Sequence, residues 1–388
     1  MTRQAGELEL RQLSSTFVEL CRIESPSGSE RRCAEFVTAE LETLGLEVAQ
    51  DEAGALTGSD CGNLLTRVPA SRAGAPPRSL MLCAHLDTVP LRAPVEPVLV
   101  DGVYENANEG ILGADNKAAV AVLLALARHA VREGSPIDLE LLFTVGEETS
   151  LAGARAFDAN RLRSDFGYVL DHASPIGGVI VGSPTQFLLE ATFRGAAAHA
   201  GICPEQGRSA IVAAARAVAA MPLGRLDART TANVGTIVGG SAVNIVPERC
   251  ELLVEVRSLD DVRAEEVVAE LVDRIHEAAN LPECDCDVDV SVERMFAGYA
   301  LSGAAPAVKA AEGALRACGY EPERISSGGG SDANALIAQG FPTVNLANGT
   351  ERNHEPGECV AVEALEGMLD VTLALLDEVA ALPAGVAV

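Results

Sequence analysis

The sequence predicts an α/β protein in which a mostly parallel sheet is flanked by helices and a ferredoxin-like domain of βαββαβ order is inserted. Two observations predict this fold. Apolar runs of strand length alternate with helical patterns, and the alternation changes character over residues 184–296 before it resumes. The length of 388 residues also exceeds the roughly 100–200 residues of a typical domain. We therefore expect a discontinuous larger domain, 1–183 with 297–388, and a second domain inserted at 184–296.

In the first segment of the discontinuous domain, helical periodicity alternates with short apolar runs. The expected elements are helices at 7–22 and 29–44, a strand at 79–86, a helix at 116–131, a strand in "DLELLFTVGEE", a helix near 151–157 and a strand in "FGYVLDHA". After the insertion we expect helices at 304–318 and 332–339, a strand in "PTVNLAN" and a final helix from about 361.

The inserted segment has the pattern of a ferredoxin-like unit. Its expected elements are a strand in "FLLEATFRG", a helix at 208–221, strands in "ANVGTIVGG" and "CELLVEVRS", a helix at 262–279 and a strand in "CDVDVSVERMF".

Composition argues against two classes of partner and favours a reducing compartment. The formal net charge of −27, without a basic cluster, repels nucleic-acid phosphates and anionic lipids, so we expect neither a nucleic-acid nor a membrane partner. No apolar run approaches the roughly 20 residues of a membrane span. The ten cysteines are scattered and no secretory signal precedes them, which favours a cytoplasmic location.

Acidic and histidine side chains stand where the predicted strands end. His85 and Asp87 close one strand, Glu147 and Glu148 follow the next, and Asp171 follows a third. Ligands of open α/β sheets bind beyond the carboxyl ends of the strands, so these groups are expected to converge in one crevice.

Two further residues complete a set of metal ligands. Asp115 opens the helix in "GILGADNKAAV", and His354 lies in the loop "GTERNHEPGE". Imidazole and carboxylate groups hold zinc and related divalent ions. One histidine and a few carboxylates per ion, with one carboxylate shared, suit a two-metal site with ions roughly 3.5–4 Å apart.

Each residue also has a simpler interpretation. Asp115 could be a helix N-cap, Asp171 a turn cap and His85 a hydrogen-bonded core histidine. Glu147 and Glu148 are harder to explain in this way, because two buried carboxylates are costly without cations or donors. We assign no site role to three other histidines, His129, His172 and His276.

The sequence resembles the dinuclear-zinc aminoacylase, carboxypeptidase and tripeptidase family, and within it most closely the peptidase T-like tripeptidases. The matching stretches, in family order across nearly the whole chain, are "AHLDTVP", "GILGADNKAAVA", "TVGEETSLAGA", "LDH", "FRGAAAHAG", "GGSAVNIVPERCELLVEVRS", "SGGGSDAN" and "NHEPGE". The inserted βαββαβ unit is similar to that family's lid and dimerisation domain.

The resemblance implies a role for each candidate ligand. Asp115 would bridge two divalent ions, with His85 and Asp171 completing one ion and Glu148 and His354 the other. Zinc is expected, while ligand chemistry leaves cobalt and manganese open. Glu147 would be the general base that polarises the metal-bridging water and passes its proton to the leaving amine. Asp87, two residues beyond His85 on the same strand face, would orient the imidazole.

The resemblance also implies a homodimer that shares its active sites. His199 would reach from one subunit's lid into the other subunit's site and stabilise the oxyanion. Asn244 and Arg257 would hold the substrate carboxylate, and Gly329 and Gly330 would let the backbone approach the substrate. Alternatively, His199 and Asn244 are turn residues and Arg257 only pairs with a neighbouring acid.

The implied function is a metal-dependent hydrolase of small peptides that releases the N-terminal residue of tripeptides. No anionic residue stands out as the partner of a substrate ammonium group, so an N-acyl-amino-acid deacylase, a desuccinylase or a dipeptidase of the same family remains the alternative. A non-catalytic ligand- or metal-binding protein is disfavoured, because all five ligand candidates and Glu147 are present.

Overall fold

The computed structural model describes residues 5–71 and 78–383, which form two compact units. The smaller unit is Ser183–Tyr299 with Gly328–Gly330, and the larger unit contains the rest. The expected insertion, 184–296, lies inside Ser183–Tyr299. The segment Gly328–Gly330 was expected in the catalytic domain but groups with the smaller unit, where the Ser183 hydroxyl donates to the Gly329 carbonyl.

The larger unit is built on a nine-stranded sheet in the order β1-β2-β6-β3-β7-β16-β8-β14, with β15 paired to β8. Its strands are β1 (Val48–Gln50), β2 (Leu64–Val68), β3 (Ser79–His85), β6 (Asp138–Thr144), β7 (Phe166–Leu170), β8 (Gly178–Ser183), β14 (Tyr299–Ala300), β15 (Glu323–Ser326) and β16 (Thr343–Leu346). The central strands β6, β3, β7 and β16 are mutually parallel. Every residue of β3 is buried, which explains its uninterrupted apolar pattern. The expected mostly parallel sheet is confirmed.

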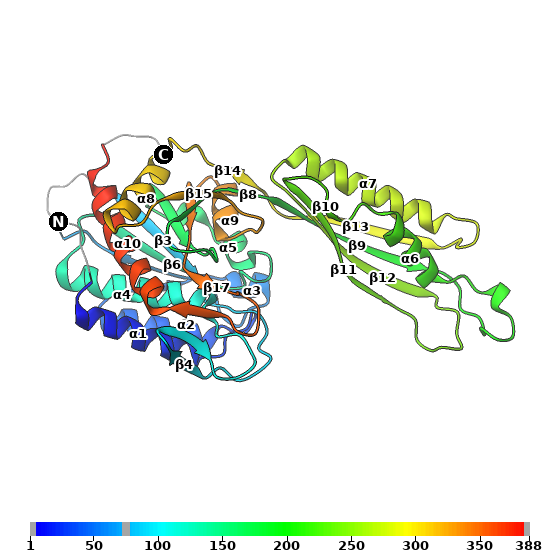
Figure 1. Cartoon of the computed structure of the whole chain (residues 1–388), viewed down its shortest axis with the longest axis horizontal. Coiled ribbons are helices and arrows are strands. Elements are labelled where there is room, and N and C mark those ends of the chain that lie inside the picture. The colour runs from blue at the N-terminus through cyan, green and yellow to red at the C-terminus, as the bar shows by residue number, and fades with distance from the viewer. Residues whose placement is uncertain (1–4, 72–77, 384–388) are drawn as a thin grey trace. The chain divides into compact units, whose positions relative to one another are not determined.

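Helices flank this sheet (Figure 1). They are α1 (Glu7–Cys21), α2 (Arg31–Thr43), α3 (Ala53–Thr57), α4 (Ala114–Glu133), α5 (Ala152–Ala156), the 3₁₀ turn η1 (Ala159–Arg161), α8 (Pro306–Ala317), α9 (Asp332–Ala338) and α10 (Val362–Ala381). Helix α4 packs on α1, α10 and β3. Its residues from Ala114 to Ala127 are all buried, because helices or strands surround it on every side.

A small second sheet in the larger unit was not predicted from the sequence. Its order is β17-β18-β5-β4, from β4 (Pro97–Val100), β5 (Val103–Asn106), β17 (Thr350–Glu351) and β18 (Cys359–Ala361). An Asp101–Gly102 turn joins β4 to β5, and both residues have positive φ, as a type I′ hairpin requires. The loop between β17 and β18 carries His354, so this sheet anchors a candidate ligand.

The smaller unit has the expected ferredoxin-like βαββαβ topology. Its antiparallel sheet runs β10-β11-β12-β9-β13, with α6 and α7 packed on the sheet. The bounds are β9 (Thr185–Arg194), the 3₁₀ turn η2 (Pro204–Gln206), α6 (Ala210–Ala220), β10 (Gly224–Arg225), β11 (Thr230–Gly239), β12 (Arg249–Ser258), α7 (Asp261–Ala279) and β13 (Asp287–Phe296). Side chains of β12 alternate between exposed and buried over most of its length, because one sheet face forms the core.

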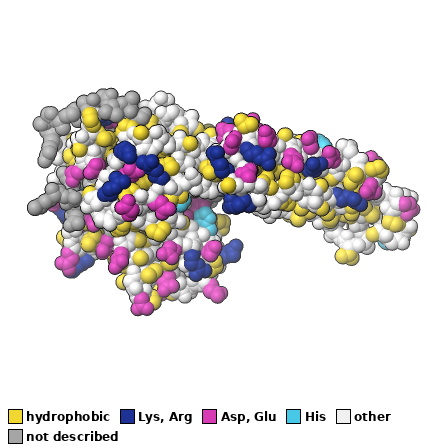
Figure 2. Space-filling view, turned by 45° about the horizontal axis from the view of Figure 1, so that its top comes forward, with side chains coloured by type: hydrophobic (Ala, Val, Ile, Leu, Met, Phe, Trp, Pro, Cys, Tyr) yellow, Lys and Arg dark blue, Asp and Glu magenta, His cyan; other side chains and the backbone are white. Residues whose placement is uncertain are grey.

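The surface is mixed in charge. On the face drawn in Figure 2, Lys and Arg side chains are interspersed with Asp and Glu on both units. Across residues 5–71 and 78–383, no helix combines the length and hydropathy needed to span a membrane.

Candidate active site

The predicted strand-end residues gather at one edge of the main sheet. His85 is the last residue of β3, Glu147 and Glu148 follow β6, and Asp171 follows β7. Strands β6 and β7 both pair in parallel with β3, so their carboxyl ends meet at the same edge.

Asp115 lies between two histidines. Its Oδ1 is 3.2 Å from Nε2 of His85, and its Oδ2 is 3.3 Å from Nε2 of His354. Asp171 Oδ1 lies 3.7 Å from the same nitrogen of His85, and Glu148 Oε1 lies 2.9 Å from that of His354. The five candidate ligands therefore form two groups that share one carboxylate, with one oxygen of Asp115 directed to each group.

The N-cap interpretation of Asp115 does not hold. No side chain caps α4, and the Asp115 oxygens contact His85, His354 and Asn353 rather than amides of the helix. Instead, the buried Glu358 carboxylate accepts the amides of Leu112, Gly113 and Asp115 at 2.8–2.9 Å. With its backbone held in this way, the Asp115 side chain is free to face the histidines.

Asp87 contacts His85 and also holds the turn after β6. Its Oδ1 lies 3.3 Å from Nδ1 of His85 and accepts the Glu147 amide at 3.0 Å. Its Oδ2 accepts the Glu148 amide at 3.1 Å and the Ser27 hydroxyl at 2.6 Å. One buried carboxylate thus orients the imidazole and fixes the backbone of both glutamates.

Burial dominates the electrostatics of the acidic groups. Burial and the neighbouring Asp171 raise the pKa of Glu147 well above its usual value. Burial also raises the pKa of Glu148 and of Asp171, with added repulsion from Asp115. Hydrogen bonds from His354 and His85 outweigh burial and lower the pKa of Asp115. The contacts with Asp115 and Glu148 raise the pKa of His354 to about 10.

The donor set fits divalent cations. Ligand atoms of His85, Asp115 and Glu148 lie within 4.8 Å of one another, and so do those of His85, Glu147 and Asp171. Glu148 Oε1 is buried, and its ion pair within the described ranges is the 2.9 Å contact with Nε2 of His354. Over the same ranges, the hydrogen bonds and ion pairs of these carboxylates include no Lys or Arg. Imidazole nitrogens and crowded carboxylate oxygens are the ligands that zinc and similar ions prefer.

The remaining candidates lie in the smaller unit. His199 is exposed, and its Nδ1 accepts the Gly201 amide at 3.2 Å. Asn244 lies nearby, because its backbone carbonyl accepts the amide of Ala200, the residue after His199, at 2.9 Å. Its side chain is also exposed. Asn244 lies in a turn, as its simpler interpretation requires, whereas His199 forms an isolated β-bridge with Ile245; both side chains are exposed.

Arg257 and the glycines of "SSGGGSD" meet in the same unit. Arg257 Nη2 lies 3.1 Å from Glu255 Oε2, and Nη1 donates to the carbonyl oxygen of Gly328 at 3.4 Å. A Cβ on Gly330 would lie 2.5 Å from the Phe296 ring, so only glycine permits this close approach. The predicted pairing of Arg257 with a neighbouring acid is present, and its side chain keeps 30% exposure.

Several residues that support the site were not singled out from the sequence. Asn345 accepts the Asp171 amide and donates to the Asp171 carbonyl, and Asn353 donates to Asp115 Oδ2 at 2.8 Å. Asn345 lies inside the apolar run "PTVNLAN", and a polar residue in a buried strand is a signal that could have identified it.

Comparison with known proteins agrees with this architecture. Residues 187–281 match the peptidase dimerisation domain, and residues 63–199 match peptidase family M28. The uncharacterised protein YqjE of Bacillus subtilis is 34% identical over 374 residues, covering 95% of this chain and 99% of that protein.

Two solved structures are similar over almost the full length. The aminopeptidase PepT from Bacillus cereus has a TM-score of 0.83 at 37% identity, covering 96% of this chain and 99% of that one. A tripeptidase from Staphylococcus aureus has a TM-score of 0.88 at 34% identity, covering 96% and 98%.

The fold, the clustered imidazole and carboxylate groups and these likenesses define a two-domain metallopeptidase. Its activity is the metal-dependent hydrolysis of peptide bonds. The chain belongs to the M20 peptidase family, among its peptidase T-like members.

Proposed function

We propose that the protein is an aminopeptidase that releases the N-terminal residue of tripeptides with two divalent ions, zinc by preference. The observation that supports a dinuclear site best is Asp115, whose two oxygens face different histidines. His85 and Asp171 would hold one ion, and Glu148 and His354 the other. When bound, such ions polarise the scissile carbonyl and ease deprotonation of the attacking water.

Glu147 performs the proton transfers in this proposal. It takes a proton from the attacking water and delivers it to the amine that leaves. Its raised pKa, caused first by burial, suits a group that must hold that proton between the two steps. Asp87 fixes the Glu147 amide and the His85 ring, so the base and a ligand keep their spacing.

The smaller unit would supply the groups that bind the substrate. His199 would stabilise the oxyanion in the active site of a partner subunit, and Arg257 and Asn244 would bind the substrate's α-carboxylate. The Arg257 guanidinium already contacts Glu255, so a substrate carboxylate would share or replace that contact. Gly329 and Gly330 would let the backbone approach the substrate.

The exposed apolar side chains of the smaller unit support a homodimer. Ile237 and Val238 on β11 are 50% and 64% exposed, and Val243 is fully exposed. Strand β10 covers only Thr231 and Ala232 of β11. An apolar edge strand of this kind is a ready surface for pairing with a second copy.

We also propose a cytoplasmic location, based on the cysteines. All ten are free thiols in the structure, and seven of them are buried. Such thiols persist in a reducing compartment.

A substrate comparison tests the tripeptidase proposal. Tripeptides with free N-termini, the same tripeptides acetylated, and acetyl- and succinyl-amino acids are compared at matched metal loading. We expect the free tripeptides to have the highest kcat/KM. Faster cleavage of the acylated amino acids would instead identify a deacylase that uses the same ligands and the same Glu147.

A further inference from the structure

Side-chain acceptors hold four consecutive amides in the turn that carries Glu147 and Glu148. Asn63 Oδ1 accepts the Val145 amide and Glu30 Oε1 accepts the Gly146 amide, each at 3.0 Å. Asp87 accepts the next two amides, at 3.0 and 3.1 Å. The turn is therefore fixed by three side chains from other segments of the chain.

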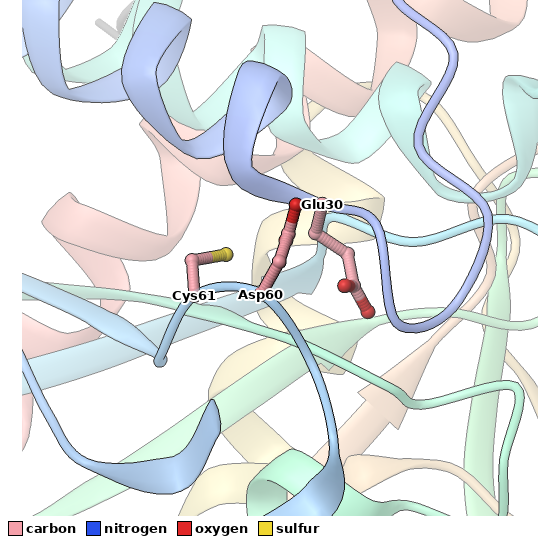
Figure 3. A group of neighbouring side chains, drawn as sticks. All are labelled: Glu30, Asp60 and Cys61. Carbon is pink, nitrogen blue, oxygen red and sulfur yellow. The ribbon is translucent and has the colours of Figure 1, made fainter. Parts of the chain in front are cut away.

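Glu30 is an acceptor that the sequence did not identify, and its hydrogen bonds go to Gly146 and Ser59. It is fully buried just before α2, and its second oxygen accepts the Ser59 hydroxyl at 2.6 Å. Figure 3 shows it beside Asp60 and Cys61, which come from the loop before β2.

The cluster Glu30, Asp60 and Cys61 has the composition of a metal site, since its ligand atoms lie within 4.8 Å of one another. Its groups are otherwise engaged. Both Glu30 oxygens accept hydrogen bonds, and Asp60 accepts the Arg31 amide at 2.8 Å. Burial raises the pKa of Cys61 to about 12, so its sulfur is a thiol and a weak ligand. The contacts of Glu30 instead indicate that it holds the backbone of this turn in place.

Glu30 holds the turn through its hydrogen bond from the Gly146 amide. Gly146 has φ +62°, a left-handed conformation, and it directly precedes Glu147. A buried amide that lost its acceptor would rotate toward another partner, and the turn would move with it.

We propose that Glu30 is a positioning residue: by accepting the Gly146 amide, it sets the backbone from which Glu147 and Glu148 project. This inference rests on the proposed function of Glu147. The role requires an acceptor oxygen at the right reach rather than a negative charge. A glutamine at position 30 therefore preserves it, whereas an aspartate, one methylene shorter, does not.

The test compares Glu30→Ala, Glu30→Asp and Glu30→Gln with the control Glu140→Ala. Glu140 is also buried and accepts two amides, those of Arg163 and Ser164, at 2.8 Å. It lies within β6, away from the strand end that carries the glutamates. Measurements are kcat and KM for a tripeptide at saturating metal, thermal unfolding, and hydrogen exchange of the peptide spanning 144–149.

We expect Glu30→Ala to lower kcat by about 10–100-fold, the cost of a displaced catalytic group or a lost supporting contact, with little change in KM. Glu30→Asp should fall between Ala and Gln, and Glu30→Gln should approach the wild type. Exchange at 144–149 should accelerate in the Ala and Asp variants only. Glu140→Ala should lower the unfolding temperature but keep kcat.

Three results would overturn the inference: unchanged turnover and exchange in Glu30→Ala, an equal loss of kcat in Glu140→Ala, or higher turnover in Glu30→Asp than in Glu30→Gln. If Glu30→Ala does not fold, the order of Asp and Gln decides. If the wild type cleaves no tripeptide, the proposed function fails, and exchange at 144–149 alone decides whether Glu30 fixes the turn.

Discussion

Apart from the exposed His354, the metal-ligand candidates of the larger unit are held differently from the candidates of the smaller unit. In the larger unit, His85 and Asp115 are buried, and the backbone of Asp115 is fixed by the carboxylate of Glu358. In the smaller unit, His199 and Asn244 are exposed and lie in two neighbouring loops that are joined through their backbones. The first region is organised before substrate arrives, whereas in our proposal the second gains further contacts from a substrate or a second subunit.

Removing the metal ions should have the largest effect, because the organised region depends on them. Prolonged chelation should abolish hydrolysis and also lower the unfolding temperature, since bound ions favour the folded state and offset the repulsion of Glu148 and Asp171 by Asp115. Activity during re-addition of zinc, cobalt or manganese, with differential scanning calorimetry, checks both outcomes. Full activity in metal-free protein would contradict the proposed site.

Replacing each of the adjacent glutamates in turn by glutamine should separate their roles. Glu147→Gln should retain both ions and lower kcat by about 10²–10⁴-fold, the usual contribution of a general base. Glu148→Gln should instead lose metal from one position, because it removes a candidate ligand of the His354 group. Elemental analysis and kcat together distinguish the two variants, and the reverse pattern would refute our assignment.

The exposed region should matter through the partner subunit. His199→Ala should lower kcat by about 10²–10³-fold, the cost of losing one oxyanion donor. Subunits carrying His199→Ala, mixed and exchanged with Glu147→Gln subunits, should regain activity, because heterodimers contain one site with both groups. His276→Ala, which alters an exposed histidine of α7 in the same unit, serves as the control and should remain active. Exchanged mixtures that stay inactive would argue against a shared site.

The apolar edge of β11 provides a separate test of assembly. The double change Ile237→Glu and Val238→Glu should convert a dimer to monomers and reduce turnover no more than His199→Ala does. Val292 on β13, at the opposite edge of the same sheet, is 44% exposed and gives the matched control Val292→Glu. Sedimentation velocity measures the outcome. If the β11 variant stays a dimer, the subunits associate through another surface.

The smallest effect is expected at Arg257. Arg257→Ala should raise KM for tripeptides by roughly 10–100-fold, since a hydrogen bond to a charged group contributes about 1.5–3 kcal/mol. The rise should vanish for tripeptides with an amidated C-terminus, which lack the carboxylate. Arg263→Ala, at an exposed ion pair of the same unit, is the control and should not change KM. An equal rise for both substrates would mean that Arg257 only supports the local structure.

The sequence predicted the sheet and the edge where the site lies. The apolar pattern of each strand marks where that strand ends, and His85, Glu147 and Asp171 stand at or just beyond those ends. It did not predict the non-helical backbone of Asn116, because the helix was expected to begin at that residue. Nor did it identify Glu30 and Glu358, which act on amides distant in the chain. Such contacts depend on tertiary packing, and no local pattern marks them.

The short loop between β17 and β18 contains both a candidate metal ligand and a residue that fixes the start of α4. It carries His354 and, four residues later, Glu358, whose carboxylate accepts the amides of Leu112, Gly113 and Asp115 around the start of α4. Adding or deleting one residue between them would displace the histidine or release those amides, so this spacing tolerates no change in length. The exposed turn around Asn244 has no such double attachment, and insertions there would leave the metal ligands where they are.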